Sequence, residues 1–206
     1  MLKVLIGTPI HICKDYCMER WLQNISKLEY PADLLMVDNS PDLDYIEKAK
    51  GYCVKYGITN YKIEHLEISQ ELSSDMRINV AQEVLRRKIL NSDYDAWFSW
   101  ECDQIIPNNA LNELIKLMET TNCKMALHNC WARFDSDLLM TDMGCTLIKK
   151  ECLKKAWFLP ERDGKISFNE SDRYKSTFKE RVLRSGGGFI EAFGVISPIY
   201  HLDNKF

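Results

Sequence analysis

Two acidic side chains, Glu101 and Asp103, follow directly after the segment 97–100, Trp-Phe-Ser-Trp. Alternate side chains of an extended chain point the same way, so both carboxylates can face one cavity while Cys102 turns into the core. Paired carboxylates at a strand end supply the oxygen ligands that Mg²⁺ and Mn²⁺ prefer. Acid-x-acid triplets are also common on solvated surfaces. Here the triplet directly follows an aromatic strand, which would hold the two acids in a fixed place, and this favours the metal-binding interpretation.

Two more polar side chains end apolar segments. Asp38 follows the segment 34–37, Leu-Leu-Met-Val, where an acid can accept hydrogen bonds from a ribose or a base. The alternative for Asp38 is a helix cap or an Asx turn, helped by Ser40 and Pro41. His201 follows the last apolar segment, and a neutral imidazole there can complete a manganese site begun by carboxylates. The alternative for His201 is a frayed terminal histidine.

The polar segment 158–174 holds a further pair of acids. Glu170 and Asp172 flank Ser171 just before a predicted helix. A carboxylate at this place could take the proton of an acceptor hydroxyl. The alternative is an N-cap on the following helix, a role that Ser171 or Asp172 would serve well.

These residues need elements that bring them together. Along the first half of the chain, short continuous apolar segments alternate with apolar residues at helical spacing. Four β-α units in sequence predict a mostly parallel central sheet flanked by helices, with ligands at the carboxyl ends of the strands. We predict strands over 4–10, 34–37, 61–68 and 96–100, and helices over 18–25 and from 40–42, 73–75 and 108–109 onward.

The second half is less regular. Apolar segments predict strands over 124–128 and 144–148 and one or two more within 189–200. A helix is expected over 174–183, ended by the Ser-Gly-Gly-Gly segment 185–188. Asp163-Gly164 is typical of a turn.

Composition narrows the function classes. The 206 residues suit one domain, and 27 basic against 30 acidic side chains give no electrostatic argument for nucleic acid. The 8 cysteines contain no Cys-x-x-Cys pair, which favours reduced thiols over a zinc site. No segment approaches the ~20 apolar residues of a membrane helix. We expect a cytoplasmic protein, or one of the host cytoplasm if its source is viral, and the oligomeric state leaves no signal.

The order of these segments resembles that of the GT-A glycosyltransferases, in particular the family-two-like, usually inverting members. The resemblance covers nearly the whole chain. It implies an α/β GT-A fold in a single domain over 1–206. About 1–105 would form the nucleotide-binding half and about 106–206 the acceptor and catalytic half.

Individual segments resemble parts of that family's donor site. Segment 3–9 is similar to the opening strand and nucleotide loop, 37–40 to the loop that holds base and ribose, and 77–81 to a segment near the donor. The resemblance therefore implies cofactor-binding roles for Thr8, Pro9, Asp38, Asn39, Arg77, Glu101 and Asp103.

The acidic motifs resemble the family's catalytic parts with two departures. Glu101-x-Asp103 stands where that family carries Asp-x-Asp, with Glu as its first acid, and His201 is similar to its late metal-binding histidine. Segment 170–172 resembles the acidic motif that holds the base, although Ser171 separates acids that are normally adjacent. The resemblance implies Asp172 as base, with Glu170 as its substitute.

The implied activity is transfer of a sugar from a nucleotide-diphosphate sugar to a hydroxyl of a glycan, lipid or protein. Mn²⁺ or Mg²⁺ would be the metal, and a UDP-sugar is favoured as donor over a GDP-sugar. One alternative is a sugar-phosphate nucleotidyltransferase, but the loop 7–11 lacks its Gly-rich signature. Another is a non-catalytic nucleotide- or carbohydrate-binding module. No Gly-x-Gly-x-x-Gly follows the first strand, so a dinucleotide enzyme is disfavoured.

Overall fold

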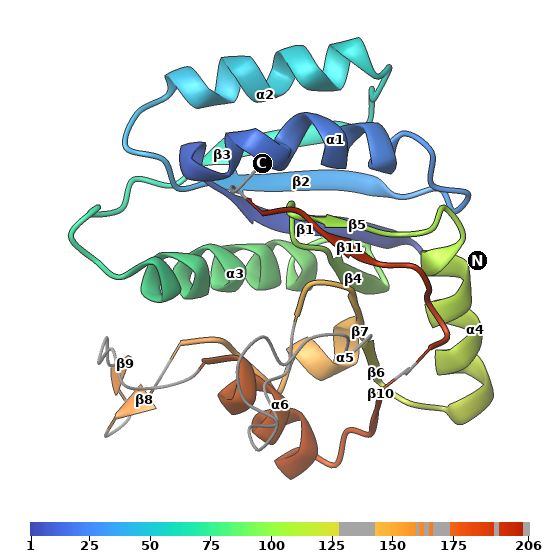
Figure 1. The fold of residues 1–206 in the computed structure, drawn as a ribbon. Coiled ribbons are helices and arrows are strands. Elements are labelled where there is room, and N and C mark those ends of the chain that lie inside the picture. The colour runs from blue at the N-terminus through green and yellow to red at the C-terminus, as the bar shows by residue number, and fades with distance from the viewer. Residues whose placement is uncertain (128–142, 160, 163–164, 167–173, 192–193, 204–206) are drawn as a thin grey trace.

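The structure is a computed structural model that describes residues 1–127, 143–159, 161–162, 165–166, 174–191 and 194–203 (Figure 1). Over these residues a central sheet has the strand order β10-β6-β7-β4-β1-β2-β3. Its strands are β1 Val4–Ile10, β2 Asp33–Asp38, β3 Tyr61–His65, β4 Ala96–Ser99, β6 Met125–Leu127, β7 Thr146–Lys149 and β10 Phe189–Glu191. Two small sheets pair β5 Gln104–Ile105 with β11 Tyr200–His201 and β8 Glu161–Arg162 with β9 Lys165–Ile166.

The sheet is mostly parallel, as predicted. β1 pairs in parallel with both β2 and β4, and β3 continues in parallel beside β2. β7 lies antiparallel between β4 and β6, and β10 pairs in parallel with β6. The carboxyl ends of β1, β2, β3 and β4 therefore meet at one edge, which is where open α/β sheets bind ligands.

Helices cover both faces of this sheet. Figure 1 shows α1 and α2 on one side and α3 on the other. The helices are η1 Ile12–Lys14, α1 Asp15–Ile25, α2 Asp44–Lys55, α3 Ser74–Leu90, α4 Ala110–Thr121, α5 Lys150–Leu153 and α6 Tyr174–Arg184. None of the helices in the described part of the chain has both the length and the apolar character to cross a bilayer.

Strand alternation divides the core into two clusters. Ile6 and Phe98 pack with residues of α1, α2 and α4, whereas their neighbours Leu5 and Trp97 pack with α3, α5 and α6. Successive strand side chains point to opposite faces, so a strand covered on both sides must be apolar at every position. This explains why segments 4–6, 34–37 and 96–98 are apolar without interruption.

Several predicted boundaries were wrong. Helix α2 begins at Asp44, so Ser40 is not its cap and Pro41 is not in its first turn. β3 ends at His65 rather than at residue 68. Asn109 stands at the N-cap of α4 without a capping side-chain hydrogen bond.

Two helix ends agree with their prediction. The Ser73 hydroxyl caps α3 by accepting a hydrogen bond from the Met76 N–H. Gly186, with φ +75°, follows α6 in the left-handed conformation that ends many helices. The predicted turn at 163–164 lies outside the described residues.

Candidate active site

The loop after β4 presents Glu101 and Asp103 at the carboxyl edge of the sheet. Trp100 anchors this loop, because its indole N–H donates to the Gln104 carbonyl and its ring packs edge-on against Trp21 at 5.6 Å. The Gln104 N–H donates to the Glu101 carbonyl at 3.1 Å and closes the turn. The turn is thus held by core contacts, and its two acidic side chains have defined positions.

Cys102 between the two acids turns inward, as predicted, and is 5% exposed. A hydrogen bond with the Cys17 thiol of α1, together with burial, raises the pKa of the Cys102 thiol. Asn24, also in α1, holds the following segment: its side chain accepts from the Ile106 N–H and donates to the Ile106 carbonyl. Helix α1 therefore supports the acidic loop from behind.

His201 reaches the same loop from the end of the chain. β11 pairs antiparallel with β5, which places His201 opposite Gln104, and the Leu202 N–H donates to the Asp103 carbonyl at 2.7 Å. The His201 imidazole Nε2 lies 3.4 Å from Asp103 Oδ1. Backbone pairing thus fixes His201 beside the acidic loop, and it is not a frayed terminal residue.

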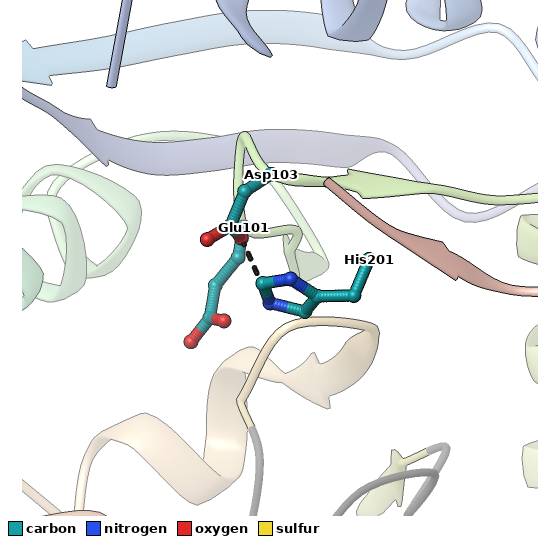
Figure 2. A group of neighbouring side chains, drawn as sticks. All are labelled: Glu101, Asp103 and His201. Carbon is teal, nitrogen blue, oxygen red and sulfur yellow. Dashed lines mark ion pairs between the residues drawn. The ribbon is translucent and has the colours of Figure 1, made fainter. Parts of the chain in front are cut away.

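Glu101, Asp103 and His201 form one cluster. Each offers a ligand atom, and these three atoms lie within 4.8 Å of one another (Figure 2). Asp103 is buried, and the other two are partly exposed, so the cluster opens toward solvent. Two carboxylates and one imidazole suit Mn²⁺ or Mg²⁺ in ligand chemistry, so the residues fit the predicted metal.

Lys14, which the sequence analysis missed, is part of this cluster. It ends η1, directly after β1, and its Nζ lies 2.5 Å from Asp103 Oδ2. Burial opposes protonation of Lys14, but the negative charge of Asp103 and the hydrogen bond to it prevail and raise its pKa above the ordinary value. The sequence could have indicated this contact. Lys14 follows β1 and Asp103 follows β4, and parallel neighbours bring their carboxyl ends together.

Asp38 at the end of β2 is fully buried and accepts several hydrogen bonds. Its Oδ1 accepts from the Ser40 N–H at 3.2 Å and from the Ser40 hydroxyl at 2.6 Å. Its Oδ2 lies 2.8 Å from His65 Nδ1 at the end of β3. The Asx turn that was one interpretation of Asp38 is present, and the helix cap is not. A role of Asp38 toward a ribose or a base stays a prediction.

The remaining predicted donor residues gather around the ends of β1 and β2. Thr8 and Asn39 are buried, and the Asn39 N–H donates to the Ile10 carbonyl at 3.0 Å. Arg77, in the first turns of α3, donates to the Gln70 carbonyl at 3.0 Å, and the Gln70 amide donates in turn to the Asn39 carbonyl. These contacts join three loops at one edge, while Pro9 is partly buried inside β1.

Glu170 and Asp172 lie outside the described residues, so their place relative to the cluster is a matter for experiment. A separate contact among the described residues supports the acidic loop. A Cβ on Gly144 would lie 2.1 Å from Gln104 Nε2, so any larger residue at 144 would require the Gln104 side chain to move. Gly144 thus packs against the residue next to Asp103.

Solved glycosyltransferase structures share this fold. A mannosyltransferase of Pyrobaculum calidifontis in complex with GDP-Man and Mn²⁺ matches with a TM-score of 0.68 and 14% identity, covering 94% of this chain and 55% of that one. S. aureus TarS residues 1–349 in complex with UDP-GlcNAc matches with a TM-score of 0.59 and 14% identity, covering 87% of this chain and 53% of that one. The chain has a GT-A-like fold.

Sequence comparison adds nothing to this likeness. No protein-family model matches the chain, and no curated protein matches its sequence. The chain spans about half the length of these two solved structures. At such low identity, the likeness establishes the fold, and any activity must be argued from the residues of the site.

Proposed function

We propose that this chain is a metal-dependent glycosyltransferase that moves a sugar from a nucleoside diphosphate sugar to an acceptor hydroxyl. One observation carries the proposal: Glu101, Asp103 and His201 converge within 4.8 Å at the carboxyl edge of a GT-A-like sheet. Ligands bind at this edge in open α/β folds, and the cluster has the ligand types of a hard divalent ion.

Each group of residues has a separate task in this proposal. Asp103, Glu101 and His201 would hold Mn²⁺ or Mg²⁺, which offsets the negative charge that develops on a departing diphosphate. The residues around the ends of β1 and β2 and the start of α3, which are Thr8, Pro9, Asp38, Asn39 and Arg77, would bind the nucleoside of the donor. The acidic loop is anchored in the core by Trp100, so its carboxylates need little reorganisation when a ligand arrives.

The transfer step is a single displacement. A bond forms between the acceptor oxygen and the anomeric carbon, and the bond from that carbon to the diphosphate oxygen breaks. The nucleoside diphosphate leaves with the bonding electrons, and the acceptor proton passes to the Asp172 carboxylate, or to Glu170 in its place. Attack from the face opposite the leaving group inverts the anomeric centre.

UDP is the preferred nucleotide in this proposal, and GDP is the second candidate. A TarS complex contains UDP-GlcNAc, and the mannosyltransferase complex contains GDP-Man with Mn²⁺. Both neighbours are glycosyltransferases, but their low identity leaves the nucleotide of this chain to be measured. The acceptor class, whether glycan, lipid or protein, is equally a matter for assay.

The decisive experiment is a thermal-shift panel of UDP, GDP, ADP and CDP, each with and without Mn²⁺. We expect a rise in Tm that needs one nucleotide and the metal together, since the diphosphate and the ion bind as a unit. Asp103→Asn should lose this rise. Equal rises in excess EDTA, or an unchanged rise in Asp103→Asn, would contradict the proposal. Pyrophosphate release from a sugar phosphate and a nucleoside triphosphate would instead identify a nucleotidyltransferase.

A further inference from the structure

Both carboxylate oxygens of Asp103 already have a partner in the described structure. Lys14 Nζ lies 2.5 Å from Oδ2, and His201 Nε2 lies 3.4 Å from Oδ1. An ammonium group therefore occupies one oxygen of the best candidate metal ligand. A divalent ion on the same carboxylate would stand within a few ångströms of this ammonium, and like charges at such a distance repel each other.

The ion pair between Lys14 and Asp103 changes the net charge that a metal ion meets at the site. Glu101 and Asp103 carry two negative charges, and Lys14 contributes one positive charge. A divalent ion alone would leave the site with an excess positive charge. A nucleoside diphosphate brings at least two negative charges, which remove this excess, and Lys14 then offsets part of the negative charge that the diphosphate adds. Without Lys14, the ion alone would balance the two carboxylates.

Lys14 also has room to change its partner. Its side chain is 38% exposed and flexible, and its Nζ already lies 3.4 Å from the Tyr16 hydroxyl. The Tyr16 hydroxyl donates to the Leu202 carbonyl beside His201, so Tyr16 marks a second position next to the cluster. A lysine ammonium is a compact charge that commonly binds phosphate.

We propose that Lys14 makes metal binding depend on the nucleotide: its ammonium holds Asp103 until the donor arrives, and then binds the donor diphosphate beside the ion. This inference rests on the proposed function. It assigns Lys14 a binding role that opposes the ion alone and favours the ion together with a diphosphate. Thermodynamic linkage then requires that the nucleotide raise Mn²⁺ affinity and that Mn²⁺ raise nucleotide affinity by the same factor.

The test compares Lys14→Met with a matched control, Lys55→Met. Lys55 also has an ion pair of 2.5 Å, with Glu19, and it lies over the Tyr56 ring at 5.7 Å, as Lys14 lies over the Tyr16 ring at 5.8 Å. The Lys55 pair joins α1 and α2 and includes none of the candidate ligands. Both variants remove one positive charge and one ion pair, but only Lys14→Met removes them beside the candidate metal ligands.

Electron paramagnetic resonance of free Mn²⁺ gives the metal affinity, and calorimetry with UDP or GDP at saturating Mn²⁺ gives the nucleotide affinity. A nearby opposite charge changes the proton affinity of a carboxylate by roughly ten- to a thousandfold, and we expect changes of about tenfold or more in these two affinities. Lys14→Met should bind Mn²⁺ alone at least tenfold more tightly and the nucleotide at least tenfold more weakly. Lys14→Arg should resemble the wild type, and Lys55→Met should change neither affinity.

The outcomes separate the two proposals. A wild-type chain that binds neither Mn²⁺ nor a nucleotide overturns the proposed function itself. A wild-type chain that binds both, with Lys14→Met unchanged in Mn²⁺ affinity, overturns the role of Lys14 alone. If Lys14→Met does not fold by circular dichroism, the wild type decides: equal Mn²⁺ affinity with and without the nucleotide refutes the coupling. Nucleotide binding in EDTA that Lys14→Met abolishes would show that Lys14 replaces the metal.

Discussion

One acidic residue ends β2 and another lies just beyond the end of β4, and the two carboxylates have opposite surroundings. Asp38, at the end of β2, is enclosed by Ser40 and His65 and has no exposed surface. Asp103, beyond the end of β4, faces Lys14 and His201, of which the former is more than a third exposed. Asp38 is enclosed by fixed neighbours and shapes the loop after β2, whereas Asp103 has a partly exposed lysine partner that can give way to a ligand.

The largest expected effect separates the two acids by activity. Asp103→Ala should lower sugar transfer by at least about a hundredfold, since a bound divalent ion is worth several kcal/mol at a departing diphosphate. Transfer or slow hydrolysis of the matching nucleotide-sugar at saturating Mn²⁺ measures this loss. Full activity in Asp103→Ala would contradict the distinction between the two acids, because Asp103 would then have no part in the transfer.

A third acid sharpens the comparison by separating proton transfer from cation binding. Asp172→Asn should leave Mn²⁺-dependent nucleotide binding intact and lower turnover by about 10²- to 10⁴-fold, the usual contribution of a general base. Calorimetry and initial rates on the same preparation give both quantities. If the variant turns over at the wild-type rate, Glu170→Gln is the next variant, and a normal rate there removes both acids from the role of base.

The enclosed acid should matter for stability. Asp38→Ala leaves the Ser40 N–H, the Ser40 hydroxyl and His65 without their shared partner, which should lower the free energy of unfolding by about 3 kcal/mol. Urea unfolding followed by circular dichroism measures this change. Asp103→Ala is the matched substitution at the open edge and should cost less than Asp38→Ala, since its partner Lys14 is partly exposed. Equal losses would erase the distinction between the two acids.

The smallest expected effect concerns the support of the open edge. Gly144→Ala would place a methyl group 2.1 Å from Gln104 Nε2 and force the Gln104 side chain to move. Overpacking of this kind costs about 1–3 kcal/mol in stability. We also expect weaker nucleotide-dependent Mn²⁺ binding, because Gln104 follows Asp103 directly. Unchanged unfolding and unchanged Mn²⁺ binding would show that Gln104 moves freely.

Much of the fold could be predicted because the burial of a helix or strand leaves a recognisable pattern of apolar residues in the sequence. Strands covered on both faces are apolar at every position, as at 34–37, and this signal is strong. The ends of helices and strands that depend on a single turn were harder to predict. The Ser40-Pro41 pair is a good helix start by composition, yet Ser40 bonds to Asp38 and α2 begins at Asp44. A local hydrogen bond competed with the cap, and propensity alone could not choose between them.

The sequence by itself determined the layered fold and the acidic loop after β4, because the apolar patterns of strands and helices are local properties. It also predicted that Cys102 points inward, although residues 101–104 form a turn and not the extended chain assumed for that prediction. Only the tertiary structure decided that β11 returns along β5 and brings His201 to Asp103, and that Lys14 from the neighbouring strand end occupies the same carboxylate. Those contacts join residues far apart in the chain. They depend on strand order and register, which the pattern of any single segment does not contain.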